Sequence, residues 1–186
     1  MASKRLQFSK VTQLKLGNKI LEDYERENWN PEMKEIHSML KQSDFKVLDV
    51  EKINNPYLYG MYLLHKEEMI KNSKIVIEDL LYHCTSPSNG LKIASKNIDW
   101  RLTCRTRFGQ GACFSKSPRY AHTHAGSDGV FVVCKVLMSV IQNLYLANYN
   151  LKIPSDGYDT TLGNNGQVYV KYDDFTFYPK YIIYYK

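Results

Sequence analysis

The sequence has no apolar segment long enough to cross a membrane. Its longest apolar runs, Gly129–Cys134 and Ile182–Tyr185, are far shorter than the roughly 18 residues that a membrane-spanning helix needs. No apolar stretch follows the charged residues Lys4 and Arg5, so the start of the chain does not resemble a secretory signal. We therefore expect an intracellular protein, cytoplasmic or nuclear, with no membrane partner.

Cysteine is scarce, and its spacing favours neither a metal site nor a disulfide framework. The four cysteines include no CxxC pair, and without a secretory signal we expect reduced thiols rather than two disulfides. They are Cys84, Cys104, Cys113 and Cys134. His122 and His124 are two residues apart, which on a helix turns their side chains about 160° away from each other. We expect no zinc and no other metal.

Common catalytic motifs are also missing. The chain contains no Walker loop, GxGxxG, HExxH or GxSxG pattern. The glycines at Gly109 and Gly111 indicate a turn. A nucleophilic pair of Cys113 with a histidine would need a base and an oxyanion site that the sequence does not show. His83 lies at the end of an apolar strand, where its chemistry alone is compatible with a structural role.

What the chain does contain is enough for one domain. Its 186 residues are 44% hydrophobic and 24% charged, which is ordinary for a globular protein. A chain of this length buries about 70% of its unfolded surface and needs no covalent staples. The 15 tyrosines favour strands and core packing.

The net charge of +6 is concentrated in one window, from Lys92 to Arg119. That window has one acidic residue, Asp99, and the rest of the chain carries 18 residues of each sign. Its seven basic residues are Lys92, Lys96, Arg101, Arg105, Arg107, Lys116 and Arg119. A solvated basic face explains such a window, and so does a site for a phosphate-bearing ligand, because clustered charge attracts small anions. RNA is a further candidate partner for it.

Short strands and small helices alternate along the chain, which predicts an α+β fold with mostly antiparallel sheet. The polar residues 1–29 predict an arm or an irregular lead-in. Helices are expected from Asn30-Pro31 through Leu40, from Asn55-Pro56 through Ile70, over Ile93–Lys96 and over Arg119–Ala125. Strands are expected over Phe45–Ile53, Asp79–Cys84, Gly111–Ser115, Gly129–Ser139, Val168–Tyr172 and Ile182–Tyr185, with a loop over Trp100–Gln110.

Several blocks, in order, carry a resemblance to one family. The clearest are Leu81–Ser86, Asn97–Arg101 and Phe108–Ser115, and the likeness continues through Tyr120–His124 and Tyr178–Ile183. Together they resemble the catalytic domain of poly(ADP-ribose) polymerases, in its mono-ADP-ribosylating branch. The resemblance implies a diphtheria-toxin-like ADP-ribosyltransferase fold, with a split, mostly antiparallel sheet and short flanking helices. It covers residues 28–186, with residues 1–27 as an N-terminal arm.

The resemblance also implies roles for individual residues. His83 matches the histidine that binds the nicotinamide-side ribose of NAD, and Thr85 the hydroxyl that faces the adenosine ribose. Residues 100–111 match the loop over the dinucleotide, and Ile182 the position at which polymerising members carry a catalytic glutamate. The basic residues of that loop, Arg101, Arg105 and Arg107, become neighbours of the pyrophosphate or adenosine. The full set expected at NAD is His83, Cys84, Thr85, Arg101, Arg107, Gly111, Cys113, Phe114, Ala121 and His124.

Four positions around the nicotinamide ring depart from the family pattern. Cys84 stands where a glycine is usual and adds a side chain in a tight place. Cys113 replaces a stacking tyrosine, Ala121 replaces a serine that binds the amide, and His124 replaces a second stacking aromatic. Losing one hydrogen-bond donor and one stacking face costs on the order of 1 kcal/mol each in NAD binding.

These features lead to one expected function and one alternative. The expected function is transfer of a single ADP-ribose from NAD to a protein or nucleic-acid acceptor, with release of nicotinamide, because an isoleucine at position 182 cannot activate a sugar hydroxyl. NAD is then a substrate, and no metal takes part. The alternative is a silenced transferase fold that serves as a protein- or RNA-binding module.

Overall fold

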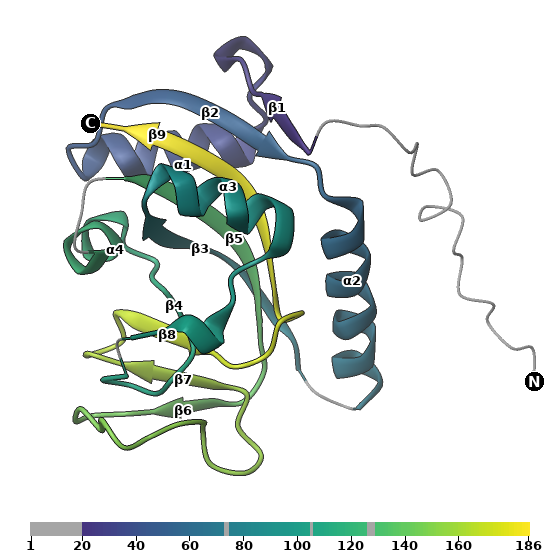
Figure 1. Cartoon of the computed structure of the whole chain (residues 1–186), viewed down its shortest axis with the longest axis vertical. Coiled ribbons are helices and arrows are strands. Elements are labelled where there is room, and N and C mark those ends of the chain that lie inside the picture. The colour runs from purple at the N-terminus through teal and green to yellow at the C-terminus, as the bar shows by residue number, and fades with distance from the viewer. Residues whose placement is uncertain (1–19, 73–74, 105, 126–128) are drawn as a thin grey trace, which may run out of the picture.

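The computed structural model describes residues 20–72, 75–104, 106–125 and 129–186, which form two β-sheets (Figure 1). The larger sheet has the order β1 (Leu21–Asp23), β2 (Val47–Ile53), β9 (Phe177–Tyr185), β5 (Val130–Met138) and β3 (Ile77–Thr85). The smaller sheet has the order β4 (Ala112–Phe114), β8 (Val168–Lys171), β7 (Thr160–Gly163) and β6 (Ile141–Asn143). Among these pairs only β6 and β7 run parallel. The α+β, mostly antiparallel prediction is confirmed.

The first two helices begin at the residues that the sequence indicates. Asn30 accepts a hydrogen bond from the Met33 amide at 2.8 Å and opens α1 (Pro31–Gln42). Asn55 accepts one from the Leu58 amide at 3.2 Å and opens α2 (Pro56–Lys71). In both helices a capping asparagine is followed by proline at the first helical position, where the missing N–H costs nothing.

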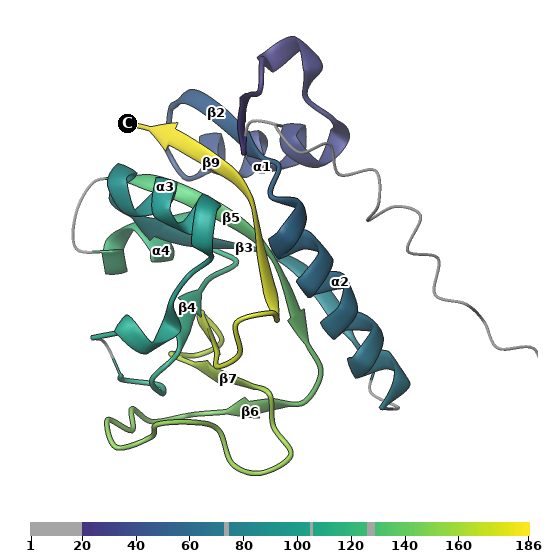
Figure 2. The same ribbon diagram turned by 45° about the vertical axis from the view of Figure 1, so that its right-hand side comes forward.

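The helices cover the two faces of the larger sheet. On one face α1 buries Met33 and Leu40 against Phe131 of β5, and α4 (Pro118–Ala125) adds Ala121 to the same cluster. On the opposite face α3 (Pro87–Lys96) buries Ile93 against the central strands. Figure 2 shows α2 running along the edge of the domain and the smaller sheet below α3. Within the described part of the chain, no helix is both long enough and apolar enough to cross a membrane.

Several elements differ from the sequence-based expectation. Part of the expected irregular lead-in belongs to the folded domain, because β1 pairs with β2 and Trp29 is buried. Residues 1–19 lie outside the described residues. Helix α3 begins at Pro87 rather than near Ile93, since Ser86 caps it through the Asn89 amide. The last strand begins at Phe177 rather than Ile182, and the short strands β6 and β7 were not expected.

Candidate active site

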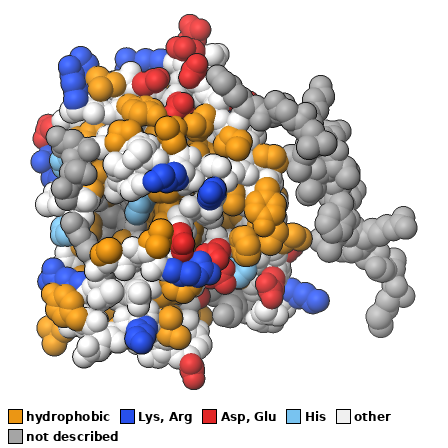
Figure 3. All heavy atoms as spheres, in the orientation of Figure 1, with side chains coloured by type: hydrophobic (Ala, Val, Ile, Leu, Met, Phe, Trp, Pro, Cys, Tyr) orange, Lys and Arg blue, Asp and Glu red, His pale blue; other side chains and the backbone are white. Residues whose placement is uncertain are grey.

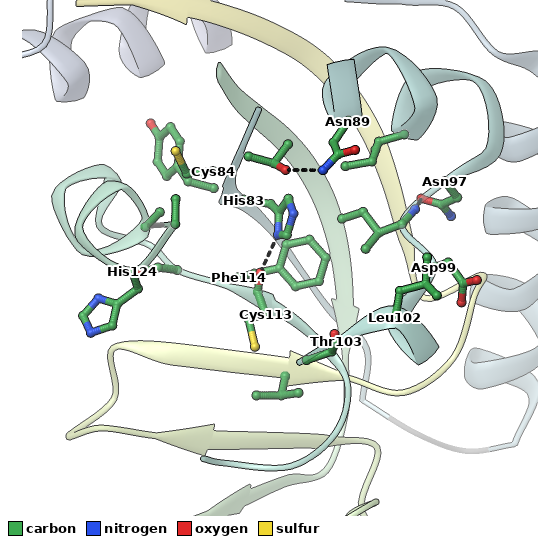
Figure 4. Close-up of a pocket in the computed structure, with 18 of the residues that line it drawn as sticks. His83, Cys84, Asn89, Asn97, Asp99, Leu102, Thr103, Cys113, Phe114 and His124 are labelled. Atoms are coloured by element: carbon green, nitrogen blue, oxygen red, sulfur yellow. Dashed lines mark hydrogen bonds between the residues drawn. The ribbon is translucent and has the colours of Figure 1, made fainter. Parts of the chain in front are cut away.

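The two sheets diverge around a cavity of about 1050 Å³, which is lined by α3, α4, the loop after α3 and strands β3, β4 and β8. An antiparallel β-bridge between the backbones of Tyr82 and Ser115 joins the two sheets. The space-filling view shows the opening as a hollow with a histidine side chain inside it and basic side chains above it (Figure 3). Figure 4 shows the labelled side chains that converge on the cavity from these elements. A volume of this size is at the upper end of the range for small-molecule sites.

His83 lies in the centre of this cavity, on the face of β3 that α3 covers (Figure 4). Its Nδ1 is 2.9 Å from the carbonyl oxygen of Cys113 in β4. A carbonyl can only accept, so Nδ1 carries the proton and Nε2 keeps its lone pair. Burial lowers the pKa of His83, and the bond to Cys113 offsets part of that effect. The imidazole is therefore neutral near pH 7 and offers an acceptor to a ligand hydroxyl.

The lowered pKa of His83 predicts a pH-dependent stability. The unfolded chain takes up a proton at this histidine below about pH 6.5, whereas the folded protein does so only at lower pH. The stabilisation that comes from His83 is therefore present above pH 6.5 and is lost as the pH falls from there toward the pKa of His83 in the folded protein. Urea unfolding at pH 7.5 and 5.5 should show that the wild type loses more free energy of unfolding in acid than His83→Gln does. Parallel losses in the two proteins would contradict the assignment.

Thr85 and the start of α3 form a polar corner next to His83. Thr85 follows His83 on the same face of β3, because alternate residues of a strand point the same way. Its hydroxyl lies 3.5 Å from the side-chain amide of Asn89, which donates to it. Lys92 and Lys96 follow one and two turns later on α3 and also line the cavity. The corner thus combines a hydroxyl, an amide and two cations.

Cys84 lines the cavity, as expected, but its side chain lies on the opposite face of β3 from His83. It pairs with Phe131 in the sheet register, so its side chain lies on the face covered by α1 and α4. Its Sγ is 3.1 Å from the hydroxyl of Tyr185, which is also 2.7 Å from Nδ1 of His122. The Cys84 thiol is therefore held against Tyr185 on that face of the sheet.

Two expected site residues do not line the cavity. Ile182 has 0% of its surface exposed and packs in the core beneath α3, next to Gly90 and Val130. Gly111 is buried against β8, and a Cβ there would lie 2.3 Å from the carbonyl oxygen of Lys171. Val168 and Val170 of the smaller sheet also line the cavity, and the sequence analysis missed them.

The remaining nicotinamide-side residues do line the cavity. They are Cys113, Phe114, Ala121 and His124. Phe114 is buried with its ring centroid 6.0 Å from that of His83, and the Cys113 thiol lies between β4 and β8 (Figure 4). His124 extends from α4 and stacks on Tyr120, with ring centroids 4.0 Å apart. Tyr120 is a lining residue that the sequence analysis did not single out.

The basic window does not form a single cationic surface. Arg101 makes bidentate hydrogen bonds to Asp174 at 2.8 and 2.9 Å and also pairs with Asp99, so it braces the loop rather than presenting a free charge. Lys116 pairs with Asp79, and Arg119 pairs with Asp44, at other parts of the surface. The window residues that line the cavity are Lys92, Lys96, Arg101 and Arg107, and Arg105 lies outside the described residues.

The cavity is poor in carboxylates. Its lining acids are Asp99 and Asp174, and both are engaged by Arg101 at the end away from Cys113. Across the described ranges, no group of three or more metal-ligating side chains lies together. The polar side chains that line the cavity near His83 are therefore neutral, and they include Thr85, Asn89 and Cys113.

Comparison with known proteins agrees with this geometry. A family model of the poly(ADP-ribose) polymerase catalytic domain matches residues 23–176. Over 172 residues the chain is 24% identical to the human protein mono-ADP-ribosyltransferase PARP14, a match that covers 83% of this chain and 10% of that protein. The chain thus spans about a tenth of the length of this curated relative. The match to the family model extends over most of the chain, including β3, α3, β4, α4 and β8 around the cavity, and on this evidence the chain belongs to the poly(ADP-ribose) polymerase catalytic domain family.

Proposed function

We propose that the protein is an NAD-dependent mono-ADP-ribosyltransferase, which transfers one ADP-ribose to a protein or nucleic-acid acceptor and releases nicotinamide. The observation that carries the proposal is His83, a neutral imidazole fixed by the Cys113 carbonyl at the centre of a dinucleotide-sized cavity. Its free Nε2 is suited to accept a hydrogen bond from a ribose hydroxyl. Membership in the family supports NAD as the substrate.

The charges around the cavity suit the rest of the dinucleotide. A pyrophosphate carries two negative charges, and three cations line the cavity, Lys92 and Lys96 from α3 and Arg107 beside Phe108. The hydroxyl of Thr85 and the amide of Asn89 supply neutral hydrogen-bonding groups beside them. We propose that these residues hold the adenosine half, while His83 and the backbone of Cys84 hold the nicotinamide half.

Transfer of a single unit is favoured by the lack of a carboxylate near His83. In this reaction the acceptor attacks the anomeric carbon of NAD as nicotinamide leaves. The protein contributes by holding the donor and by stabilising developing charge. Val168 and Val170 cannot activate a sugar hydroxyl, and Asp99 and Asp174 are committed to Arg101. The acceptor therefore supplies its own reactive group, and chain elongation is not expected.

A catalytically silent fold is the second candidate. Cys113 offers no aromatic face and Ala121 no hydroxyl, which weakens the grip on a nicotinamide ring. In that case the domain serves as a binding module. The hydrogen bond between His83 and the Cys113 carbonyl favours the transferase, because it keeps Nε2 as an acceptor for a ribose hydroxyl. Since Lys116 and Arg119 pair elsewhere, RNA binding through the basic window remains a prediction without structural support.

Incubation with labelled NAD separates the two candidates. We expect the wild type to release nicotinamide and to become labelled, and we expect both signals to be lost in His83→Ala. The circular dichroism spectra of the two proteins provide the folding control. If neither label nor released nicotinamide is detected at millimolar NAD, the transferase is ruled out and the silent fold remains.

A further inference from the structure

Tyr120 joins α4 to the turn between β7 and β8. The side-chain amide of Asn164 donates a hydrogen bond to the Tyr120 hydroxyl at 3.1 Å. Asn164 and Asn165 have positive φ angles of 50° and 55°, as a tight turn between antiparallel strands requires. The turn is immediately followed by β8, which carries Val168 to the cavity wall. The bond therefore ties the tip of this hairpin to a helix of the other half of the domain.

Tyr120 also fixes the orientation of His124 one turn later on α4. Their rings are stacked, with centroids 4.0 Å apart and planes 22° apart. Nδ1 of His124 lies 2.9 Å from the Tyr120 carbonyl oxygen, which can only accept, so Nδ1 carries the proton. The stack and this hydrogen bond restrain the His124 imidazole at two points, although its side chain is exposed.

The ring of Tyr120 packs at the end of the cavity where Cys113 is small. It lies against the cluster formed by Phe108, Val168 and Val170, which Cys113 also contacts. The side chain is half-buried and lines the cavity. A thiol fills much less space than an aromatic ring, so Cys113 leaves a volume beside it that the ring of Tyr120 occupies. The distance between α4 and β8 at this end therefore depends on Tyr120.

From these contacts we propose that Tyr120 is a positioning residue for the donor site: it holds His124 and the β7–β8 hairpin around Cys113 and so sets the width of the nicotinamide end. The proposal rests on the NAD-dependent function proposed above. The Tyr82–Ser115 bridge joins the two sheets through the main chain. Tyr120 adds a link between α4 and the β7–β8 hairpin that is made by side chains.

Two substitutions remove the same hydrogen bond from opposite ends. Tyr120→Phe deletes the hydroxyl and keeps the ring, and Asn164→Gly deletes the amide without straining a positive φ. We expect each to raise the KM for NAD about threefold to tenfold, with kcat changed less than twofold. The double variant should match the single ones, since the second change has no bond left to remove.

Loss of the ring should have a larger effect. We expect Tyr120→Leu to raise the KM for NAD more than about tenfold and to shift the ring-proton NMR signals of His124, which lose the ring current of a stacked tyrosine. Tyr145→Leu is the matched control, because Tyr145 is 89% exposed and outside the cavity lining. It should leave both KM and the His124 signals unchanged.

The two readouts separate this proposal from the proposed function. If the wild type neither binds nor uses NAD, the transferase proposal fails and so does the donor-site role of Tyr120, whatever the His124 signals show. If the wild type is active but Tyr120→Leu leaves KM and the His124 signals unchanged, the positioning role alone is overturned. A fall in kcat with unchanged KM would also contradict it, because a wider binding end affects the donor before the chemical step.

Discussion

Replacing Lys171 with methionine is expected to lower the free energy of unfolding by about 3–5 kcal/mol, because it leaves a buried carboxylate without its cation. Lys171 has 0% of its side chain exposed, and its ammonium donates to the Asp159 carboxylate at 2.9 Å, the Asp159 carbonyl at 3.1 Å and the Thr160 hydroxyl at 2.7 Å. Asp159 in turn accepts from the backbone amides of Ser139 and Val140. The pair fastens the segment before β7 to β8, the strand that forms the cavity wall.

The pH dependence of this penalty checks its origin. Burial acts to raise the pKa of Asp159, but the charge of Lys171, the Thr160 hydroxyl and the Val140 amide outweigh it and hold the pKa below its usual value. The stabilisation is present above the unfolded pKa and is lost as the pH falls through the folded one. Urea unfolding at pH 7 and at about pH 3 should therefore show a large difference between wild type and Lys171→Met that shrinks in acid.

Two further variants test the Lys171 prediction. Adding Asp159→Asn to Lys171→Met should recover part of the loss, because no buried charge then remains unpaired. Lys34→Met on the exposed surface of α1 should change stability by less than about 0.5 kcal/mol. If Lys171→Met lowers the free energy of unfolding no more than Lys34→Met does, the Lys171–Asp159 pair contributes little to stability.

Local sequence signals predicted the elements that depend on local chemistry. The Asn-Pro pairs at residues 30–31 and 55–56 fix the starts of α1 and α2, because capping and proline geometry act within one turn. The strands β6 and β7 are only three and four residues long, and their parallel pairing joins residues about 19 apart in sequence. Such pairing is set by tertiary contacts, so no local pattern could have predicted it.

The residue types of the site could be predicted from the sequence, but the direction in which each side chain points could not. Alternation on β3 places His83 and Cys84 on opposite faces, and the resemblance gave no indication of which departures reach the cavity. Ile182 was assigned through the resemblance, as the position of the polymerase glutamate, yet in the structure it is fully buried beneath α3. From the sequence, Arg101 was expected to bind phosphate, but in the structure it pairs with Asp174, which lies more than seventy residues later in the chain. Each correction comes from a contact between distant segments.

His83→Ala should also have a large effect, on NAD affinity. The substitution removes the acceptor at the cavity centre and leaves a ribose hydroxyl without a partner in a partly dehydrated site. Loss of such a bond costs about 1–3 kcal/mol, which corresponds to a Kd weaker by about fivefold to 150-fold. The protein should stay folded, because the Cys113 carbonyl that loses its donor lines a cavity that water can enter.

The measurement that tests the central claim most directly is a calorimetric titration of NAD into the wild type and into His83→Ala. The cavity and its neutral histidine predict saturable binding at one site in the wild type, and a Kd weaker by about fivefold or more in the variant. Equal affinity in the two proteins, or no binding to the wild type at millimolar NAD, would contradict the assignment of this cavity as the NAD site.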